Sequence, residues 1–206
     1  MTKIKICGIT SREDIELINE FLPEYAGFVM FYPKSKRNIS VETAKSLLSA
    51  LDKRIKAVAV TVSPDEKQVA EIASCGFDLV QIHGTLTDEA LNNSSIPILR
   101  AVNVKSCESK YDFPEHKNIV GYVFDAASPG SGKTFDWELL GNIPRDSRLF
   151  MLAGGLNSEN VLQAIERVNP DIVDVSSGVE NDCGKGKSRA KVERFISLVR
   201  GKQPKK

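Results

Sequence analysis

The chain alternates short apolar runs with longer segments in which apolar residues recur every three or four positions. In the first unit, residues 3–9 alternate apolar and polar side chains, and residues 11–22 place Ile15, Ile18 and Leu22 along one stripe. A period of two is typical of a strand, and a spacing of three or four is typical of a helix that buries one face. This unit therefore predicts a strand followed by a helix.

Seven further strand segments follow in the same manner, each bounded by turn or capping residues. The predicted strands cover residues 25–31, 56–62, 78–83, 97–104, 118–126, 148–153 and 172–176. The predicted helices begin near Ser40, Ser63, Thr87, Phe135, Asn157 and Ser188, whereas residues 106–116 have weak helical periodicity and contain Pro114. Strands that alternate with helices in this way indicate repeated βα units.

Capping residues mark several of the predicted helix ends. Thr10 and Glu13 have the spacing of a capping box, and Ser40 is a favourable N-cap residue. Residues 63–66 read Ser-Pro-Asp-Glu, which predicts an N-cap at the serine, a first-turn proline and an acidic capping partner. Gly76 is expected to end that helix.

The number of units predicts the fold. Eight strands that alternate with about eight helices, with no linker or change in composition, predict a closed (β/α)8 TIM barrel of parallel strands. We expect residues 1–206 to form one compact domain, with residues 202–206 as a frayed tail. A doubly wound open sheet is the alternative, and it would require one of the eight units to be spurious.

Charge and composition narrow the function classes. The chain has 28 Lys and Arg against 27 Asp and Glu, so its net charge of +1 gives no reason to expect binding to nucleic acid or to a membrane. No apolar run approaches the roughly 20 residues of a membrane helix. The cysteines form no C-x-x-C pair, so we expect a cytoplasmic protein with reduced thiols. They are Cys7, Cys75, Cys107 and Cys183.

The carboxyl ends of the predicted strands carry polar and reactive side chains. These ends meet on one face of a barrel, where barrel enzymes bind their ligands, so we expect the side chains to surround one site. Cys7 could equally be a small apolar strand residue, and His83 could be a packed turn residue or a substrate contact. Two histidines and scattered carboxylates predict no metal. The candidates are Cys7, Arg37, His83, Asp125, Gly154, Gly155, Ser176, Ser177 and Gly178.

The glycines and serines after the last two strands suggest a phosphate site. Gly154 and Gly155 can expose backbone N–H groups, and the hydroxyls of Ser176 and Ser177, beside Gly178, can donate to phosphate oxygens. Barrels frequently bind phosphate between these two loops, although two ordinary tight turns would have the same composition.

A second glycine-rich segment imitates part of a P-loop. Residues 130–134 read Gly-Ser-Gly-Lys-Thr, but Ala127 stands where the P-loop motif requires a glycine. A glycine-rich loop over a ligand therefore fits better than NTPase activity.

Together these segments resemble the phosphoribosylanthranilate isomerase family of tryptophan biosynthesis. The resemblance implies an eight-fold barrel that needs no cofactor. It also implies an Amadori rearrangement of N-(5-phosphoribosyl)anthranilate to 1-(2-carboxyphenylamino)-1-deoxyribulose 5-phosphate. The matching stretches span nearly the whole chain in order and cover residues 5–10, 27–29, 33–37, 80–84, 124–125, 130–137, 154–157 and 174–180.

The resemblance also implies individual roles. Cys7 matches the general base, Asp125 the general acid and Arg37 the residue that orients the anthranilate carboxylate, while the last two loops hold the phosphate. The chemistry requires a protonated Asp125 and a Cys7 thiolate, whose pKa should lie below the free value of roughly 8.5. Lys5 should face the same way as Cys7 and pair with Asp174, either as a structural ion pair or as a charge that helps to ionise the thiol.

Two other functions stay open at this point. One is a phosphate-binding barrel isomerase that acts on another aminosugar phosphate, and the other is a barrel that only binds a phosphosugar or a pathway partner. The sequence also leaves open transient contact with other enzymes of the tryptophan pathway.

Overall fold

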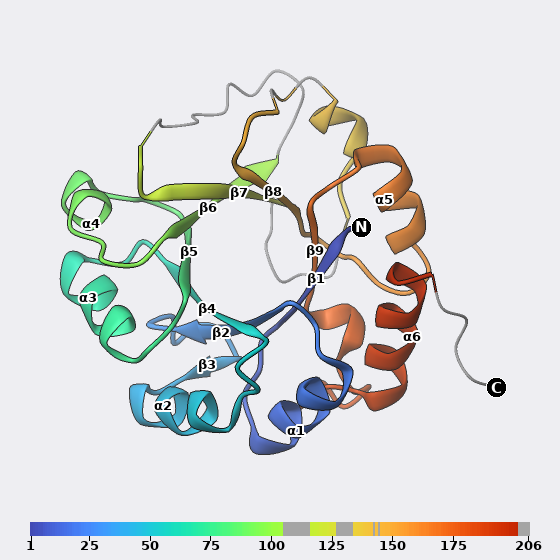
Figure 1. Ribbon diagram of the computed structural model, residues 1–206, viewed down its shortest axis with the longest axis horizontal. Helices are drawn as coiled ribbons and strands as arrows, with labels where there is room; N and C mark the ends of the chain where they lie inside the picture. Colours follow the sequence, from blue (N-terminus) through green and yellow to red (C-terminus); the bar gives the residue numbers. More distant parts are fainter. Residues whose placement is uncertain (105–115, 127–133, 142, 144, 202–206) are drawn as a thin grey trace.

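A closed ring of parallel strands forms the centre of the computed structural model, which describes residues 1–104, 116–126, 134–141, 143 and 145–201. In these residues nine strands run in the order β1-β9-β8-β7-β6-β5-β4-β2-β3, and β1 also pairs with β2 (Figure 1). The predicted parallel barrel is confirmed, and this closure rules out the open sheet. The strands are β1 (Lys3–Cys7), β2 (Tyr25–Met30), β3 (Asn38–Ile39), β4 (Lys56–Val62), β5 (Leu79–His83), β6 (Ile98–Val104), β7 (Ile119–Ala126), β8 (Leu149–Leu152) and β9 (Ile172–Val175).

Helices surround the ring on its outside (Figure 1). The strand β3 was not predicted; it has two residues and pairs only with the end of β2, so eight strands make up the barrel itself. The predicted helix near Phe135 is a short 3₁₀ turn. The helical elements are α1 (Arg12–Phe21), α2 (Val41–Ala50), α3 (Glu66–Ser74), α4 (Asp88–Asn92), η1 (Trp137–Leu140), α5 (Val161–Val168), η2 (Ser177–Val179) and α6 (Arg189–Val199).

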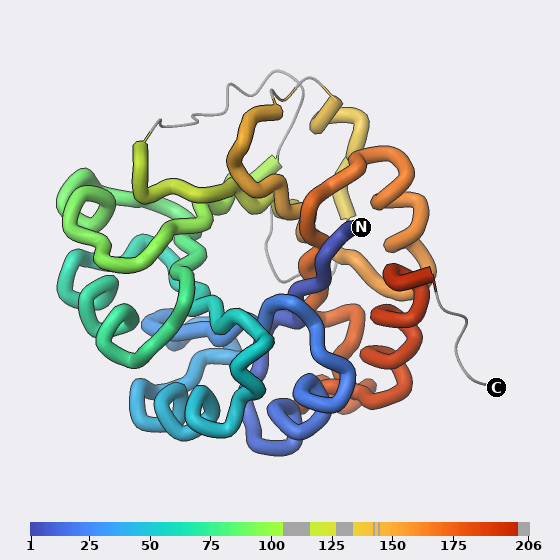
Figure 2. Tube along the Cα trace, in the orientation of Figure 1, coloured from blue at the N-terminus to red at the C-terminus, as the bar shows by residue number. Residues whose placement is uncertain are grey.

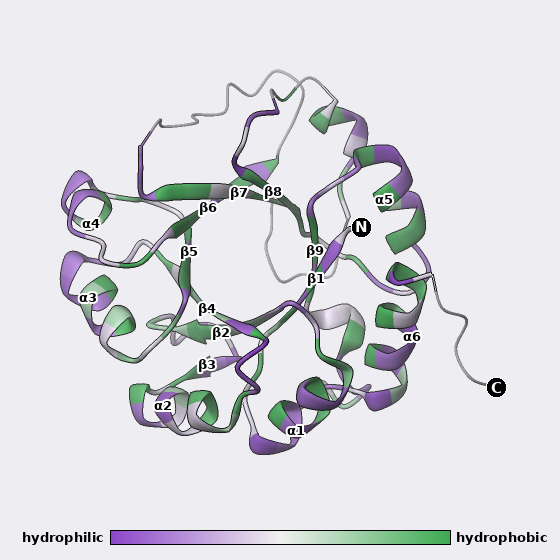
Figure 3. Cartoon of the chain, viewed as in Figure 1, coloured by the Kyte–Doolittle hydropathy of each residue, from purple (hydrophilic) through white to green (hydrophobic). Residues whose placement is uncertain are grey.

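The side chains of β1 alternate between the outside and the inside of the barrel. Ile4 and Ile6 point outward into the large core between strands and helices, whereas Cys7 belongs to a separate apolar cluster inside the barrel. Lys5 also points inward and is fully buried. In Figure 3 the ring of strands is mainly hydrophobic, and α3 and α4 turn hydrophilic residues away from it. The barrel interior can thus hold polar groups without weakening the outer core.

The two ends of the chain meet in the barrel wall. Lys3, Ile4, Lys5 and Ile6 of β1 are in register with residues 172–175 of β9, and Figure 2 shows the blue start of the tube beside its orange-red final third. Residues that follow β9 are therefore brought next to residues that follow β1 and β2.

Several predicted caps differ from the structure. Ser11, not Thr10, caps α1, because the Thr10 N–H and hydroxyl both donate to the Asp14 carboxylate. Asp65, not Ser63, caps α3 and forms the capping box with Gln68.

Other helix ends agree with the prediction or move a little. Ser40 caps α2 as predicted, α4 begins near Thr87 as predicted, with Thr87 as its cap, and Gly76 follows the end of α3 with a positive φ of 93°. The helix expected to begin at Asn157 starts at Val161, because Asn157 instead closes a turn by accepting from the backbone N–H of Glu159.

Some predictions fall outside the described residues. These are the weak helix over residues 106–116 apart from its last residue, the loop over 128–134 apart from Thr134, Cys107, and the tail over 202–206. In the part of the chain that is described, no helix has the length and apolar character needed to cross a membrane.

Candidate active site

A cavity of about 670 Å³ lies at the carboxyl ends of the strands. It brings together eight of the nine predicted site residues, whereas Gly178 packs behind the cavity wall. A Cβ atom at Gly178 would lie 2.1 Å from the carbonyl oxygen of Leu156, so the loops after β8 and β9 touch there. The predicted residues that line the cavity are Cys7, Arg37, His83, Asp125, Gly154, Gly155, Ser176 and Ser177.

Cys7 ends β1 with its side chain inside the barrel, and it is 8% exposed. Burial raises the pKa of the Cys7 thiol, and the negative charge of Asp174 raises it further, while the charges of Lys5 and Lys187 oppose this shift. The direction is opposite to the one that the sequence analysis required of a ready thiolate. Ionisation of Cys7 therefore depends on the groups around it.

Lys5 and Asp174 form the ion pair that the sequence predicts. Lys5 Nζ donates to Asp174 Oδ2 at 2.8 Å, and the two residues are register partners on β1 and β9. Burial alone would lower the pKa of Lys5, but the Asp174 carboxylate and Cys7 together raise it. A charged ammonium is thus held beneath the cavity floor, two residues before Cys7 on the same face of β1.

Asp125 stands at the end of β7 and is buried apart from 8% of its surface. Burial raises the pKa of Asp125 to about 6, although its Oδ1 atom accepts a 2.7 Å hydrogen bond from the Ala126 N–H, which acts in the other direction. Gly154 makes room for this carboxyl: a Cβ atom there would lie 2.8 Å from the Ala126 nitrogen and 3.1 Å from Asp125 Oδ1. A carboxyl with such a pKa can hold or release a proton near neutral pH.

His83 lies on the cavity wall beside Gln81, which the sequence analysis did not single out. Their Nε2 atoms are 2.8 Å apart, and burial, with the charges of Lys5 and Arg100, lowers the pKa of His83 to about 4. His83 is therefore a neutral hydrogen-bonding group. The spacing of Gln81, two residues before His83 on one strand, places it on the same face and could have revealed it.

Arg37 enters the cavity from the loop between β2 and β3. Its side chain is 14% exposed, and its Nε atom donates to Glu180 Oε1 at 2.5 Å. Gly8 allows this approach, because a Cβ atom at Gly8 would lie 2.5 Å from Arg37 Cδ. Tyr32 and Lys34 line the same side of the cavity.

The loops after β8 and β9 form a glycine-rich wall, and the β9 loop adjoins Arg37: the same Cβ atom at Gly8 would lie 3.1 Å from Ser176 Oγ. Gly154 and Gly155 have φ angles of 87° and 66°, which L-residues with side chains rarely adopt. Among the described residues, the backbone N–H groups of Gly155 and Ser177 have no hydrogen-bond acceptor. Two unpaired donors on neighbouring loops suit an anionic group.

The described residues contain no group of three or more His, Cys, Asp and Glu side chains that could hold a metal ion. The donors and acceptors of the cavity are instead single groups, namely cationic side chains, backbone N–H groups, a carboxyl and a thiol.

Comparison with known proteins places this arrangement in a family. The family described as N-(5'phosphoribosyl)anthranilate (PRA) isomerase matches residues 4–197. The chain belongs to the phosphoribosylanthranilate isomerase family. The resemblance of the sequence to this family is thereby confirmed.

Individual members of the phosphoribosylanthranilate isomerase family resemble the chain over nearly its whole length. An N-(5'-phosphoribosyl)anthranilate isomerase of Thermoanaerobacter sp. (strain X514) is 42% identical over 98% of this chain and 99% of its own. The isomerase of Streptococcus mutans is 39% identical over 97% of this chain and 100% of its own. The match therefore covers nearly the whole of each of these two relatives.

Solved structures of family members share the barrel. The phosphoribosyl anthranilate isomerase of Thermus thermophilus superposes with a TM-score of 0.85 at 25% identity, covering 97% of this chain and 99% of that protein. Another was solved in complex with reduced 1-(o-carboxyphenylamino)-1-deoxyribulose 5-phosphate; its TM-score is 0.82 at 33% identity, over 98% of this chain and 100% of that protein.

Proposed function

We propose that this protein converts N-(5'-phosphoribosyl)anthranilate into 1-(2-carboxyphenylamino)-1-deoxyribulose 5-phosphate by general acid and base catalysis. The observation that carries the proposal is that Cys7, Asp125 and Arg37 line one cavity together with the glycine-rich loops after β8 and β9, in a chain that belongs to this family. The relative bound to the reduced form of this product supports the choice of substrate.

Asp125 is the general acid of the first step. It donates its proton to the furanose ring oxygen of the substrate, the bond from that oxygen to C1 breaks, and the anthranilate nitrogen forms a protonated Schiff base with C1. A pKa of about 6 leaves roughly a tenth of the Asp125 carboxyl groups protonated at pH 7. The negative charges of the substrate raise that fraction further.

Cys7 is the general base of the second step. Its thiolate removes the proton from C2 of the open sugar, and the electron pair left on C2 moves to the Schiff base to give an enolamine, which becomes the ketone. The pair of Cys7 and Asp125 carries one proton in its active form, with the proton on the carboxyl and the charge on the sulfur. The ammonium groups of Lys5 and Lys187 act toward this form by lowering the pKa of Cys7, against the burial that favours a neutral thiol.

Two anchors hold the two ends of the substrate. Arg37 pairs with the anthranilate carboxylate, and the N–H groups and hydroxyls of the loops that contain Gly155, Ser176 and Ser177 hold the 5'-phosphate. His83 and Gln81 are available to hydrogen-bond the sugar between the anchors. Holding both ends of a flexible, ring-opened sugar keeps C2 in reach of the thiol.

A direct assay tests the proposal. Purified protein mixed with phosphoribosylanthranilate should consume the fluorescent substrate with saturation kinetics, and chromatography should separate the isomeric product, which has the same mass as the substrate. Cys7→Ala protein of unchanged thermal stability is the control. Binding of the substrate without turnover would instead favour a barrel that only binds a phosphosugar, and turnover of a different aminosugar phosphate alone would favour the other isomerase.

A further inference from the structure

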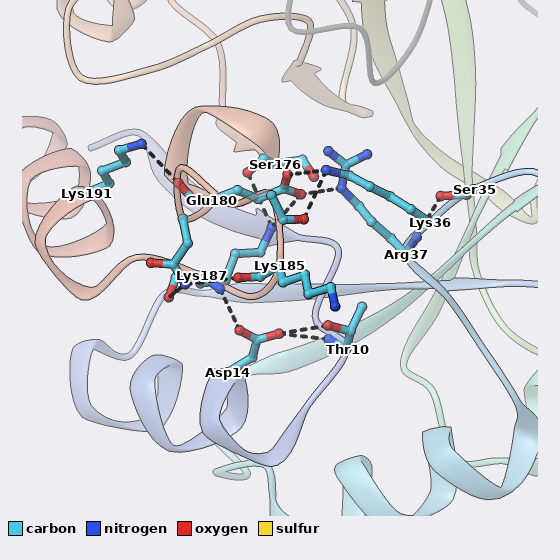
Figure 4. Close-up of polar contacts among 12 residues, drawn as sticks. Thr10, Asp14, Ser35, Lys36, Arg37, Ser176, Glu180, Lys185, Lys187 and Lys191 are labelled. Carbon is cyan, nitrogen blue, oxygen red and sulfur yellow. Dashed lines mark hydrogen bonds and ion pairs between the residues drawn. The ribbon is translucent and has the colours of Figure 1, made fainter.

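Glu180 lies directly behind Arg37. Its Oε1 atom accepts the 2.5 Å hydrogen bond from Arg37 Nε, although the two residues are 143 positions apart in the chain. Figure 4 shows the Arg37 side chain reaching across from its loop to the Glu180 carboxylate. The side chains are 14% and 9% exposed, so water screens this pair much less than it screens an ion pair on the surface.

The contact occupies only one edge of the guanidinium group. Nε–H donates to Glu180, while in the described part of the chain the two Nη atoms of Arg37 have no hydrogen-bond partner. Arg37 lines the cavity, and the planar fork of its two Nη groups matches the two oxygens of a carboxylate. The edge that Glu180 leaves free is the one that can bind a ligand bidentately.

Glu180 is itself held in place from several sides. Its Oε2 atom accepts from Lys36 Nζ at 3.0 Å, Lys187 Nζ lies 3.7 Å from its Oε1 atom, and its backbone carbonyl accepts from Lys191 Nζ at 3.0 Å (Figure 4). Burial would raise the pKa of Glu180, but hydrogen bonds from Arg37 and Lys36 hold it below its ordinary value. The carboxylate is therefore charged and has little freedom to rotate.

The position of Glu180 in the chain adds a second consequence. Glu180 directly follows η2, and its N–H donates to the Ser177 carbonyl at 3.1 Å. The loop that offers Ser176 and Ser177 to the phosphate thus also carries the carboxylate that contacts Arg37. One short segment connects the two anchors of the substrate.

We infer that Glu180 is the positioning residue for Arg37, and that it turns the Nη edge of the guanidinium toward the aromatic carboxylate of the substrate. The inference rests on the proposed role of Arg37. It assigns to Glu180 no contact with the substrate, so the effect of Glu180 must pass through Arg37 and must depend on the substrate having a carboxylate.

A pair of substrates tests this dependence. One is phosphoribosylanthranilate, and the other is the analogue built from aniline, which lacks the carboxylate. Glu180→Gln should raise KM and lower kcat/KM for phosphoribosylanthranilate about ten-fold or more, the loss typical of a charge-assisted hydrogen bond, and should leave kcat/KM for the analogue within about two-fold. Asp182→Asn is the matched control, because it removes an exposed carboxylate of the same loop that pairs with Lys191 and not with Arg37.

The Arg37→Ala variant separates the role of Arg37 from the role of Glu180. It should lose activity on phosphoribosylanthranilate only, and adding Glu180→Gln to it should change nothing further. If Arg37→Ala affects both substrates equally, the proposed role of Arg37 fails and the inference falls with it. If Arg37→Ala discriminates between the substrates but Glu180→Gln does not, only the role of Glu180 is overturned.

Two further measurements distinguish positioning from other effects. A lower KM in Glu180→Gln would show that Glu180 competes with the substrate for Arg37, which overturns the inference. Inhibition by inorganic phosphate should be the same in Glu180→Gln as in the parent. If phosphate inhibition weakens as much as kcat/KM falls, Glu180 acts on the phosphate loop instead. Should Glu180→Gln fail to fold, Glu180→Asp, which keeps the charge but withdraws it by one methylene, is expected to show the same discrimination between the substrates.

Discussion

The thiol of Cys7 occupies the space that a side chain at position 27 would need. A Cβ atom at Gly27 would lie 2.7 Å from Cys7 Sγ and 3.1 Å from its Cα atom, and the two residues are register partners on β1 and β2. Gly27 therefore leaves the space in which the thiol sits, because it has no side chain.

Replacing Gly27 by alanine should displace the Cys7 thiol. We expect Gly27→Ala to lower kcat about ten-fold or more, since small misplacements of a reacting group are costly, and to reduce the free energy of unfolding by about 1–3 kcal/mol through overpacking. Steady-state kinetics and denaturant titration measure the two effects. In a Cys7→Ala background the stability cost should shrink, because the closest clashing atom is gone; an equal cost in both backgrounds would contradict the proposed contact.

Cys7→Ala and Asp125→Asn should each lower kcat by about 10² to 10⁴, the usual contribution of a general base or acid. Both variants should keep the circular dichroism spectrum of the parent, because neither side chain is part of the core between strands and helices. Turnover of phosphoribosylanthranilate at close to the parent rate by either variant would remove that residue from the mechanism.

The raised pKa of Asp125 also predicts how stability depends on pH. The carboxyl has a pKa of about 6 in the folded protein against an ordinary value of 3.8, so its favourable contribution is complete below pH 4 and is lost as the pH rises through 6. Asparagine has no such loss. Asp125→Asn should therefore be more stable than the parent by up to about 3 kcal/mol at pH 8, with the difference shrinking toward pH 4 in denaturant titrations. A difference that does not change with pH would argue against a buried, ionised Asp125.

Removing Lys5 should lower the stability of the protein and also change the electrostatic environment of Cys7. Lys5→Met leaves the Asp174 carboxylate buried without its 2.8 Å partner, which should cost about 3–5 kcal/mol of unfolding free energy, part of which Asp174→Asn should restore. The pKa of the Cys7 thiol should also rise, because the Lys5 charge acts to lower it. Iodoacetamide reaction rates against pH, with the other three cysteines replaced by serine, measure this shift. An identical Cys7 pKa in both proteins would reduce Lys5 to a structural ion pair.

Arg37→Ala should mainly weaken substrate binding. The loss of a charge-assisted, bidentate pair predicts a KM at least about ten-fold higher, with a smaller change in kcat. Arg54→Ala is a suitable control, because Arg54 pairs with Asp52 at the protein surface. Unchanged KM and kcat in Arg37→Ala would reject its role as the carboxylate anchor.

Most of the barrel could be predicted because each strand has a local signature. The segment from Lys56 to Val62 was predicted with the bounds that it has in the structure, since a β-branched run between turn residues has few other ways to bury itself. Capping was less predictable: Thr10 and Ser11 are both good caps, and the choice fell to Ser11 because the Asp14 side chain, which also accepts from the Lys187 N–H, is fixed by the tertiary structure.

The sequence by itself determined the strand order along the chain, the face on which Cys7, Asp125 and Arg37 would lie, and the pairing of Lys5 with Asp174. These follow from periods of two along strands and from the closure of a parallel ring. Only the tertiary structure decided that Glu180 holds Arg37, that Gly27 makes space for the thiol, and that burial raises the pKa of Cys7. Those relationships join residues that are distant in sequence through side-chain packing and the exclusion of water, neither of which has a local signature.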